Sequence, residues 1–440
     1  MTKKILLASL LLSGGLAMVH AQQPGPKQQA LGIEQLFTLI EANSKSIRTQ
    51  KTGVEAARQG VEAAKSQRLP DVDASLSVSY IGNALLTDRD FSNAHGLSSP
   101  HLGNSFSLQA QQAVYTGGAL SSGIRLAELG KEMAETGVRL TRQQVRFMAL
   151  GQYLDLFKLD NRMQVYLKNI ELTRQLIADI TEKQAQGMAL KNDITRYELQ
   201  MESLKLGLTA LRNSRSILNH QLCNTLGLDG QTEIRPDTTL TAQAYAQDGE
   251  AHWQTQSATL SPRLEQSAIQ TRMAEQKERL AKSDMLPKIA LVAADNFDGP
   301  VLFELPPVDK NLNVWYVGVG IKYSLSSLFK SNKRIRQARF ETMQSKEAHA
   351  EQAEQLNNDV QAAYVNYLQT YVELETQQKS VELARQNYDV VNARYLSQLA
   401  LVTDMVDASN LCLNAELQEV DARINIVYAF YRMKYLAGLL

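Results

Sequence analysis

The chain has 440 residues, with 46 Lys and Arg against 46 Asp and Glu, so it lacks the basic excess that nucleic-acid binding requires. Aromatic residues make up only 6% of it and prolines number 10, while Gln, Ala, Leu, Glu and Arg recur throughout. This composition is typical of long helices and coiled coils.

The N-terminus has the pattern of a secretory signal peptide. Lys3 and Lys4 precede the apolar run 5–12, and the sequence V-H-A ends at Ala21, so cleavage is expected after about Ala21 and residues 22–30 are expected to be a flexible leader. The mature sequence has no apolar run long enough for a membrane-spanning helix, so any part that enters a bilayer must consist of strands.

The first half of the mature chain alternates between helical and strand-like periods. Apolar residues recur at helical spacing over 33–67 and predict a helix that stops before Pro70. Alternating apolar and polar residues predict strands over 72–82 and 104–115. Helical spacing then continues from 119 to 185 without proline and predicts a helix ~100 Å long, followed by a turn at 186–193. A shorter helix completes a first structural repeat, residues 22–230.

The second half repeats this order. Residues 231–259 are polar and are expected to form a linker or equatorial segment. A helix, strands at 288–297 and 313–325, a long helix, a turn at 396–403 and a final helix make up a second repeat over 260–440. Pro287 follows Pro70 by 217 residues and Asp404 follows Asp193 by 211 residues, so the halves indicate a tandem duplication.

These elements predict how chains assemble. Four strands cannot close a barrel, and open strand edges are not tolerated in lipid, so several chains must share one barrel. Two chains would supply eight strands, three would supply twelve and leave a lumen, and four would supply sixteen. The long helices have narrow apolar seams and must pack side by side, which favours a hollow α-helical cylinder. The predicted fold is therefore mainly α, with four transmembrane β-strands per chain.

Two short stretches match each other across the repeats. An Ala-Leu pair precedes an aspartate in both: Leu190 and Asp193 in one, Leu401 and Asp404 in the other. Asp407 follows three residues after Asp404, so both carboxylates leave a helix from the same face. Such an acidic pair is by itself most often a solvated helix face.

The chain resembles the TolC-like outer-membrane channels of tripartite efflux and type I secretion systems. The resemblance covers essentially all of the mature chain. The residues that carry it are Arg68-Leu69-Pro70, Met285-Leu286-Pro287, Tyr115-Thr116-Gly117-Gly118, and Tyr395 ahead of the run T-D-M-V-D-A at 403–408. It implies a homotrimer with a twelve-stranded barrel in the outer-membrane lipid, a periplasmic α-barrel, and a constricted periplasmic end. A periplasmic adaptor protein and an inner-membrane pump would be its partners, and the channel would be a passive exit duct.

The resemblance also assigns roles to residues. Asp404 and Asp407 match the acidic positions that line the family's aperture, where six carboxylates in a trimer would favour cations. Tyr395 and Asp193 match positions whose hydrogen bond between helices holds the aperture closed. Two residues depart from the family's pattern in the second turn. Ala400 stands where the family has an arginine, and Gln398 stands where it has a glycine. The adaptor-docking turns would be Gly187, Met188, Ala189 and Leu190 in the first repeat, and Gln398, Leu399, Ala400 and Leu401 in the second.

Other functions have less support. The histidines show no metal-ligand spacing, and no nucleophile motif or phosphate-binding loop is found, so neither a cofactor nor an enzymatic activity is expected. Cys223 and Cys412 lie too far apart along the predicted helices for a disulfide. The alternative to a channel is a periplasmic coiled-coil scaffold or adaptor without a pore, against which the four amphipathic strands argue. The cargo is not encoded in any recognisable motif.

Overall fold

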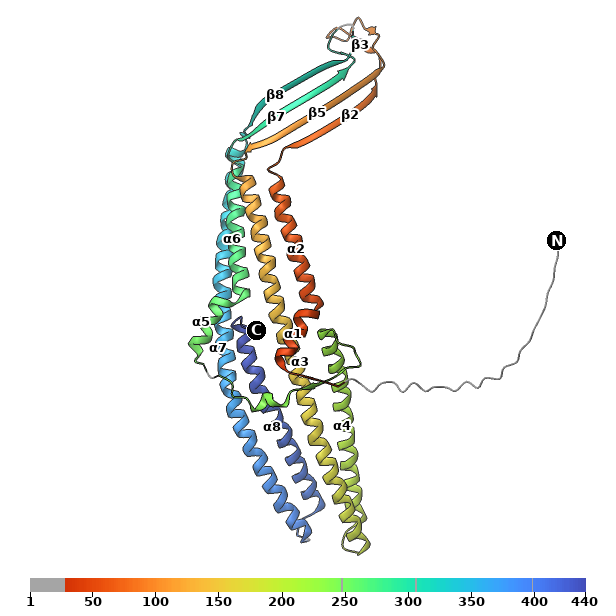
Figure 1. The fold of residues 1–440 in the computed structure, drawn as a ribbon, viewed down its shortest axis with the longest axis vertical. Coiled ribbons are helices and arrows are strands. Elements are labelled where there is room, and N and C mark those ends of the chain that lie inside the picture. Colours follow the sequence, from red (N-terminus) through yellow and green to blue (C-terminus); the bar gives the residue numbers. More distant parts are fainter. Residues whose placement is uncertain (1–27, 247, 305–306, 398) are drawn as a thin grey trace, which may run out of the picture.

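The computed structural model describes residues 28–246, 248–304, 307–397 and 399–440; the predicted signal peptide lies outside them. A long layer of helices carries a tilted sheet at one end (Figure 1). The elements of the first half are β1 (Gln28–Leu31), α1 (Ile33–Asn43), α2 (Lys45–Ser66), β2 (Asp71–Tyr80), β3 (Ala84–Leu86), β4 (His95–Leu97), β5 (Leu102–Tyr115), α3 (Ala119–Ala185) and α4 (Lys191–Leu226). Those of the second half are β6 (Glu233–Pro236), the 3-10 helix η1 (Thr238–Ala242), α5 (Glu250–Leu260), α6 (Pro262–Ser283), β7 (Lys288–Gly299), β8 (Leu312–Lys322), α7 (Ser327–Leu396) and α8 (Val402–Leu436).

The antiparallel sheet has the order β2-β5-β7-β8 and two chemically different faces. Leu76, Phe106 and Phe297 are paired across three strands and share the apolar face. Ser105 and Asp298 face each other on the opposite side, where their side chains are hydrogen bonded. Since paired residues in an antiparallel sheet point to one face, the period-2 pattern of the sequence becomes one apolar and one polar surface. Within the described chain the sheet stays open, with β2 and β8 at its edges.

The helices form a single layer that continues below the sheet. Close to the sheet the order across the layer is α2, α3, α6 and α7, and in the far half it is α4, α3, α8 and α7. The long helices α3 and α7 run through both halves, whereas shorter helices meet end to end beside them (Figure 1). One such joint is made by Asn43, whose Nδ2 donates to Leu226 O at 2.8 Å. The protomer is therefore a strip with two long edges, one formed by β2, α2 and α4 and the other by β8 and α7.

Several local signals end the helices. Gly118 precedes α3 with φ 88° and Gly227 follows α4 with φ 66°, a left-handed conformation that glycine adopts without strain. The helix predicted over 33–67 is divided into α1 and α2 at Ser44, whose hydroxyl accepts a hydrogen bond from Ile47 N at 3.4 Å. Serine is a strong N-terminal cap, which explains why a new helix begins there despite the continuous apolar stripe.

Short elements form a belt around the middle of the layer. Gln28–Leu31 forms a parallel pair with β6, so residues 28–30 of the expected flexible leader 22–30 are ordered as a strand. The expected linker 231–259 contains β6, η1 and α5. Tyr153 on α3 joins the two segments, because its buried hydroxyl donates to Leu31 O at 2.6 Å and accepts from Asp237 N at 2.8 Å. The two hydrogen bonds of Tyr153 thus fix the backbone of two segments whose sequences are polar and show neither helical nor strand periodicity.

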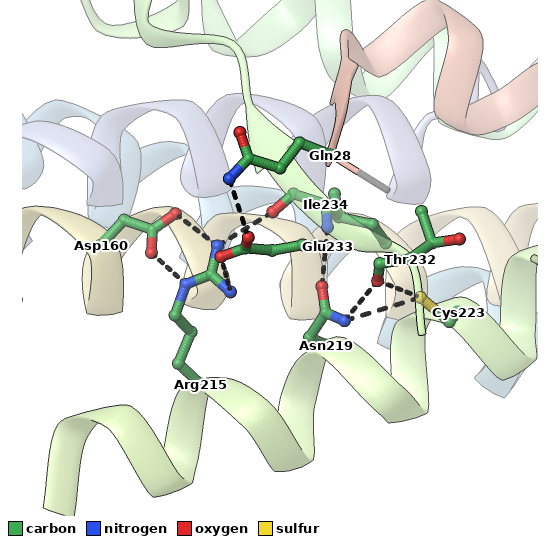
Figure 2. A network of polar contacts seen from close by, with 8 residues as sticks. All are labelled: Gln28, Asp160, Arg215, Asn219, Cys223, Thr232, Glu233 and Ile234. Carbon is green, nitrogen blue, oxygen red and sulfur yellow. Dashed lines mark hydrogen bonds and ion pairs between the residues drawn. The ribbon is translucent and has the colours of Figure 1, made fainter. Parts of the chain in front are cut away.

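A polar network fastens this belt to the helices (Figure 2). Arg215 on α4 pairs with Asp160 on α3, forms an ion pair with Glu233 at 3.1 Å, and donates to Ile234 O at 3.1 Å. Asn219 donates to Thr232 O at 2.7 Å and accepts from Ile234 N at 2.9 Å. Beside it, the buried thiol of Cys223 contacts the same carbonyl at 3.3 Å. The network pins β6 in place, and none of its residues forms a motif in the sequence.

Candidate gate at the hairpin tips

The two matching stretches lie at the end of the helical layer farthest from the sheet, in the turns that join α3 to α4 and α7 to α8 (Figure 1). In the first turn, Leu190 N donates to Asp193 Oδ2 at 3.1 Å and Asp193 N donates to Leu190 O at 3.0 Å. In the second, Leu401 N donates to Asp404 Oδ2 at 3.0 Å and Asp404 N donates to Leu401 O at 3.1 Å. The shared motif is thus a helix cap in which an aspartate at the third helical position satisfies an otherwise unpaired N–H.

The residues before each cap expose apolar side chains. Gly187 has φ 73°, and Met188 N donates back to Lys183 O at 2.9 Å. Leu399 N donates to Arg394 O at 2.8 Å in the equivalent place, while Gln398 lies outside the described residues. The predicted docking residues divide by exposure: Met188, Leu190, Leu399 and Leu401 are 51–70% exposed, and Ala189 and Ala400 are half-buried.

Asp404 and Asp407 both lie in the first turns of α8 and are exposed. Asp404 uses one carboxylate oxygen in the cap, and within the described chain the Asp407 carboxylate makes neither a hydrogen bond nor an ion pair. Because the two residues are three positions apart on one helix, their carboxylates lie on one side of it. The structure therefore brings together two solvent-accessible negative charges at the tip.

Tyr395 is half-buried in a cluster that joins both hairpins. Ile180, Tyr197, Val402 and Met405 form its buried centre, and Tyr395 packs against them. Lys183 Nζ lies 5.4 Å from the centroid of the Tyr395 ring, a cation–π distance.

Asp193 also lies near Tyr395. Burial and, to a smaller extent, the Asp193 carboxylate raise the pKa of Tyr395. No hydrogen bond joins the two side chains among the described residues, so the structure places the members of the expected pair together without that bond. The sequence predicts Tyr395 and Asp193 as a pair, whereas no spacing rule connects Lys183 to the tyrosine.

Two features are absent from the described residues. No group of three or more His, Cys, Asp or Glu residues is arranged to hold a metal ion. None of the described helices is sufficiently long and apolar to cross a membrane.

Comparisons with known proteins identify the family. The model of the family described as outer membrane efflux protein matches residues 36–228 and 253–439. No curated protein is significantly similar in sequence.

Several solved structures share the fold. One is CusC, with 14% identity, a TM-score of 0.79, and 92% of each chain covered. VceC from Vibrio cholerae has 13% identity and a TM-score of 0.75, covering 92% of this chain and 96% of its own. The open-state channel MtrE from Neisseria gonorrhoeae has 15% identity and a TM-score of 0.72, covering 92% and 89%.

These findings confirm the resemblance stated from the sequence, including the expectation that the protein transports and does not catalyse a reaction. The chain belongs to the outer membrane efflux protein family.

Proposed function

We propose that the protein is the outer-membrane exit channel of a tripartite efflux or type I secretion system, and that it conducts substrates passively from an inner-membrane pump. The observation that carries the proposal is the single-layered protomer, with an amphipathic sheet at one end and paired hairpin tips at the other (Figure 1). One such strip encloses no space. Several copies would enclose a continuous duct if one edge of each copy packed against the opposite edge of the next.

The exposed surfaces of the edges support closure by copies of the same chain. On α4, Leu199, Leu206 and Ile217 are 62–72% exposed. On α7, the apolar residues Val365, Val372, Leu383 and Val390 are 53–63% exposed. Pairs spaced by seven residues on both helices are typical of coiled-coil seams, so α4 of one copy would pack against α7 of the next.

The sheet edges would join in the same way. Pairing β2 of one copy with β8 of the next would satisfy both open edges, and three copies would close a barrel of twelve strands with a lumen. The apolar face, which includes Trp315 at 72% exposure, would contact outer-membrane lipid. The polar face, which includes Ser105 and Asp298, would line the pore.

At the other end, Asp404 and Asp407 of three copies would form a ring of six carboxylates at the periplasmic aperture and favour cations. Tyr395 and Asp193 would contribute to its closed state. The exposed Met188, Leu190, Leu399 and Leu401 would be the docking surface for the periplasmic adaptor, together with the rest of the turns Gly187–Leu190 and 398–401. The proposal also includes cleavage of a signal peptide after about Ala21. The mature chain would then consist of two structural repeats, 22–230 and 260–440, joined by the segment 231–259.

Single-channel recording in planar bilayers tests it. The sharpest variant is Asp404→Asn/Asp407→Asn, because asparagine keeps an acceptor for the cap at 404 while both charges are removed. The wild type should show a small cation-selective conductance, and the double variant should lose cation selectivity. Glu198→Gln removes an exposed charge from α4 near the other tip and should leave selectivity unchanged.

The outcomes separate the competing functions. An unchanged selectivity in the double variant would place the constriction elsewhere in a channel. Failure of the folded wild-type protein to form trimers or to conduct would contradict the channel and favour a periplasmic scaffold.

A further inference from the structure

A cavity of about 450 Å³ lies where the segment after α8 meets the junction of α5 and α6. Leu260 and Pro262 line it from the junction, and Gly438, Leu439 and Leu440 line it from the segment after α8. A Cβ atom at Gly438, whose φ is 80°, would clash with Leu260 O, so the two segments are in close contact. Tightly packed backbone therefore forms this side of the cavity.

The α3 side of the cavity is basic. Arg139, Arg142 and Arg146 line it at spacings of three and four residues, which place them on one side of the helix. Glu41 on α1 is the only acidic side chain among the described residues that line the cavity. Leu440, the last residue, forms no ion pair with these arginines in the described part of the chain. The lining side chains therefore carry three positive charges and one negative charge.

Arg146 is the member of this arginine group that lacks a carboxylate of its own. Arg139 pairs with Glu265 on α6. Arg142 Nε donates to Glu41 Oε2 at 2.7 Å, whereas Arg146 Nη2 lies 4.0 Å from the same oxygen. The side chain of Arg146 is 24% exposed, and its buried Nε has no hydrogen-bond partner in the described chain.

The surroundings of Arg146 disfavour its positive charge. Burial and the neighbouring charge of Arg142 lower the pKa of Arg146, and nearby carboxylates oppose this shift only in part. Glu41 is held in place on its other side, where Oε1 accepts from Lys51 Nζ at 2.9 Å. The ring of Phe37, whose centroid lies 5.4 Å from the Arg146 guanidinium carbon, gives a cation–π contact. Since a partly buried cation needs an anion close by, an anion in the cavity would stabilise Arg146.

A phosphate group matches the charge and the size of this cavity. A guanidinium binds phosphate through two parallel N–H···O bonds, and a phosphate monoester carries about two negative charges at pH 7. A volume of 450 Å³ admits a phosphate with a small group attached. Pro262 is the first residue of α6, and the positive end of the helix dipole there also favours an anion.

We propose that this cavity binds a phosphate group, held by the guanidinium of Arg146 with Arg142 and Arg139 beside it. The ligand would be inorganic phosphate or a small phosphate ester. Arg139 is 47% exposed, so the ligand can enter from solvent. Binding here does not require conduction, so the site goes beyond the proposed channel function and either one can fail without the other.

Isothermal titration calorimetry of the detergent-solubilised full chain, at low ionic strength, tests the site. Inorganic phosphate and glycerol 2-phosphate are the probes, and succinate is the comparison because it carries two carboxylates. The test variant is Arg146→Gln. Arg174→Gln is the matched control: it also removes one positive charge from α3, but Arg174 is 65% exposed, pairs with Glu171 on the same helix and lies outside the cavity.

We expect saturable binding of phosphate at one site per chain. Its Kd should be roughly tenfold higher in Arg146→Gln, which loses a charge-assisted hydrogen bond, and unchanged in Arg174→Gln. Arg146→Lys keeps the charge without the planar fork and should bind with intermediate affinity. Tighter binding of glycerol 2-phosphate than of inorganic phosphate would identify an ester as the ligand, and the reverse order would identify the free ion.

Thermal unfolding provides a second measurement that does not depend on calorimetry. Phosphate should raise the Tm of the wild type and leave that of Arg146→Gln unchanged, because only binding to the folded state stabilises it. Three results would overturn the site: no saturable binding by folded wild-type protein, wild-type affinity in Arg146→Gln, or tighter binding of succinate than of both phosphate probes.

Discussion

At the scale of single residues, two buried tyrosines differ in what their hydroxyl groups contact. Tyr153 is fully buried and its hydroxyl bonds to Leu31 O and Asp237 N, so it joins the equatorial belt to α3. Tyr197 is 1% exposed in the tip cluster, and its hydroxyl has no hydrogen-bond partner among the described residues. Burial of an unpaired hydroxyl costs free energy, whereas a paired one contributes modestly to stability.

The two tyrosines therefore predict opposite effects of the same substitution. Tyr153→Phe should lower the free energy of unfolding by about 1–3 kcal/mol, because Leu31 O and Asp237 N would lose a buried partner. Tyr197→Phe should leave the stability unchanged or increase it. Denaturant unfolding of both variants checks this, and a larger loss for Tyr197→Phe than for Tyr153→Phe would show that the Tyr197 hydroxyl is bonded in the assembled protein.

At the scale of elements, the aspartates predicted for the aperture also determine where helices begin. Asp193 and Asp404 cap α4 and α8 through the amides of Leu190 and Leu401. Asp407 makes no such contact in the described chain. The matching Asp positions of the two repeats thus coincide with helix caps, and the charge proposed for the aperture at 404 would be added to a structural role.

Alanine substitution should separate these roles. Asp404→Ala should destabilise the start of α8 by about 0.5–1 kcal/mol, because it removes the cap and a charge favourable to the helix dipole. Asp407→Ala should leave the cap intact. Hydrogen exchange at the Leu401 amide measures the difference: faster exchange in Asp404→Ala alone is expected, and equal rates in the two variants would contradict the cap.

At the scale of the whole molecule, the layer has two apolar edges that one copy cannot cover. The exposed seam on α4 is centred on Leu206, which is 72% exposed. A charge placed there would be buried without a partner if α7 of a neighbouring copy packs on it.

If the protein assembles as the proposed trimer, Leu206→Glu should therefore shift it toward monomers. Lys205→Glu, at an exposed polar position about 100° around the helix from Leu206, is the matched control and should assemble as the wild type does. Light scattering of detergent-solubilised protein measures the mass of each variant. A Leu206→Glu protein that assembles as the wild type does would show that this seam is not the interface between copies.

The sequence by itself determined what depends on near neighbours along the chain. Alternation with period 2 predicted the amphipathic strands, and sustained helical spacing predicted α3 from 119 to 185, where the structure has it. Pro70 and Pro287 marked helix ends because the residue before proline disfavours helical backbone. The family motifs located the hairpin tips and their acidic residues.

Only the tertiary structure decided the contacts between residues distant in sequence. The pairing of β1 with β6, the clamp made by Tyr153 and the Arg215 network bring together polar groups from separate segments (Figure 2). In the sequence, Glu416 is one of many charged residues on a long helix. In the structure it is buried between α3, α7 and α8 and accepts hydrogen bonds from Lys168 and Arg385. The periodicity of apolar residues shows which face of a helix or strand is apolar. The partner of a polar side chain depends instead on which helices pack together, and the whole chain decides that packing.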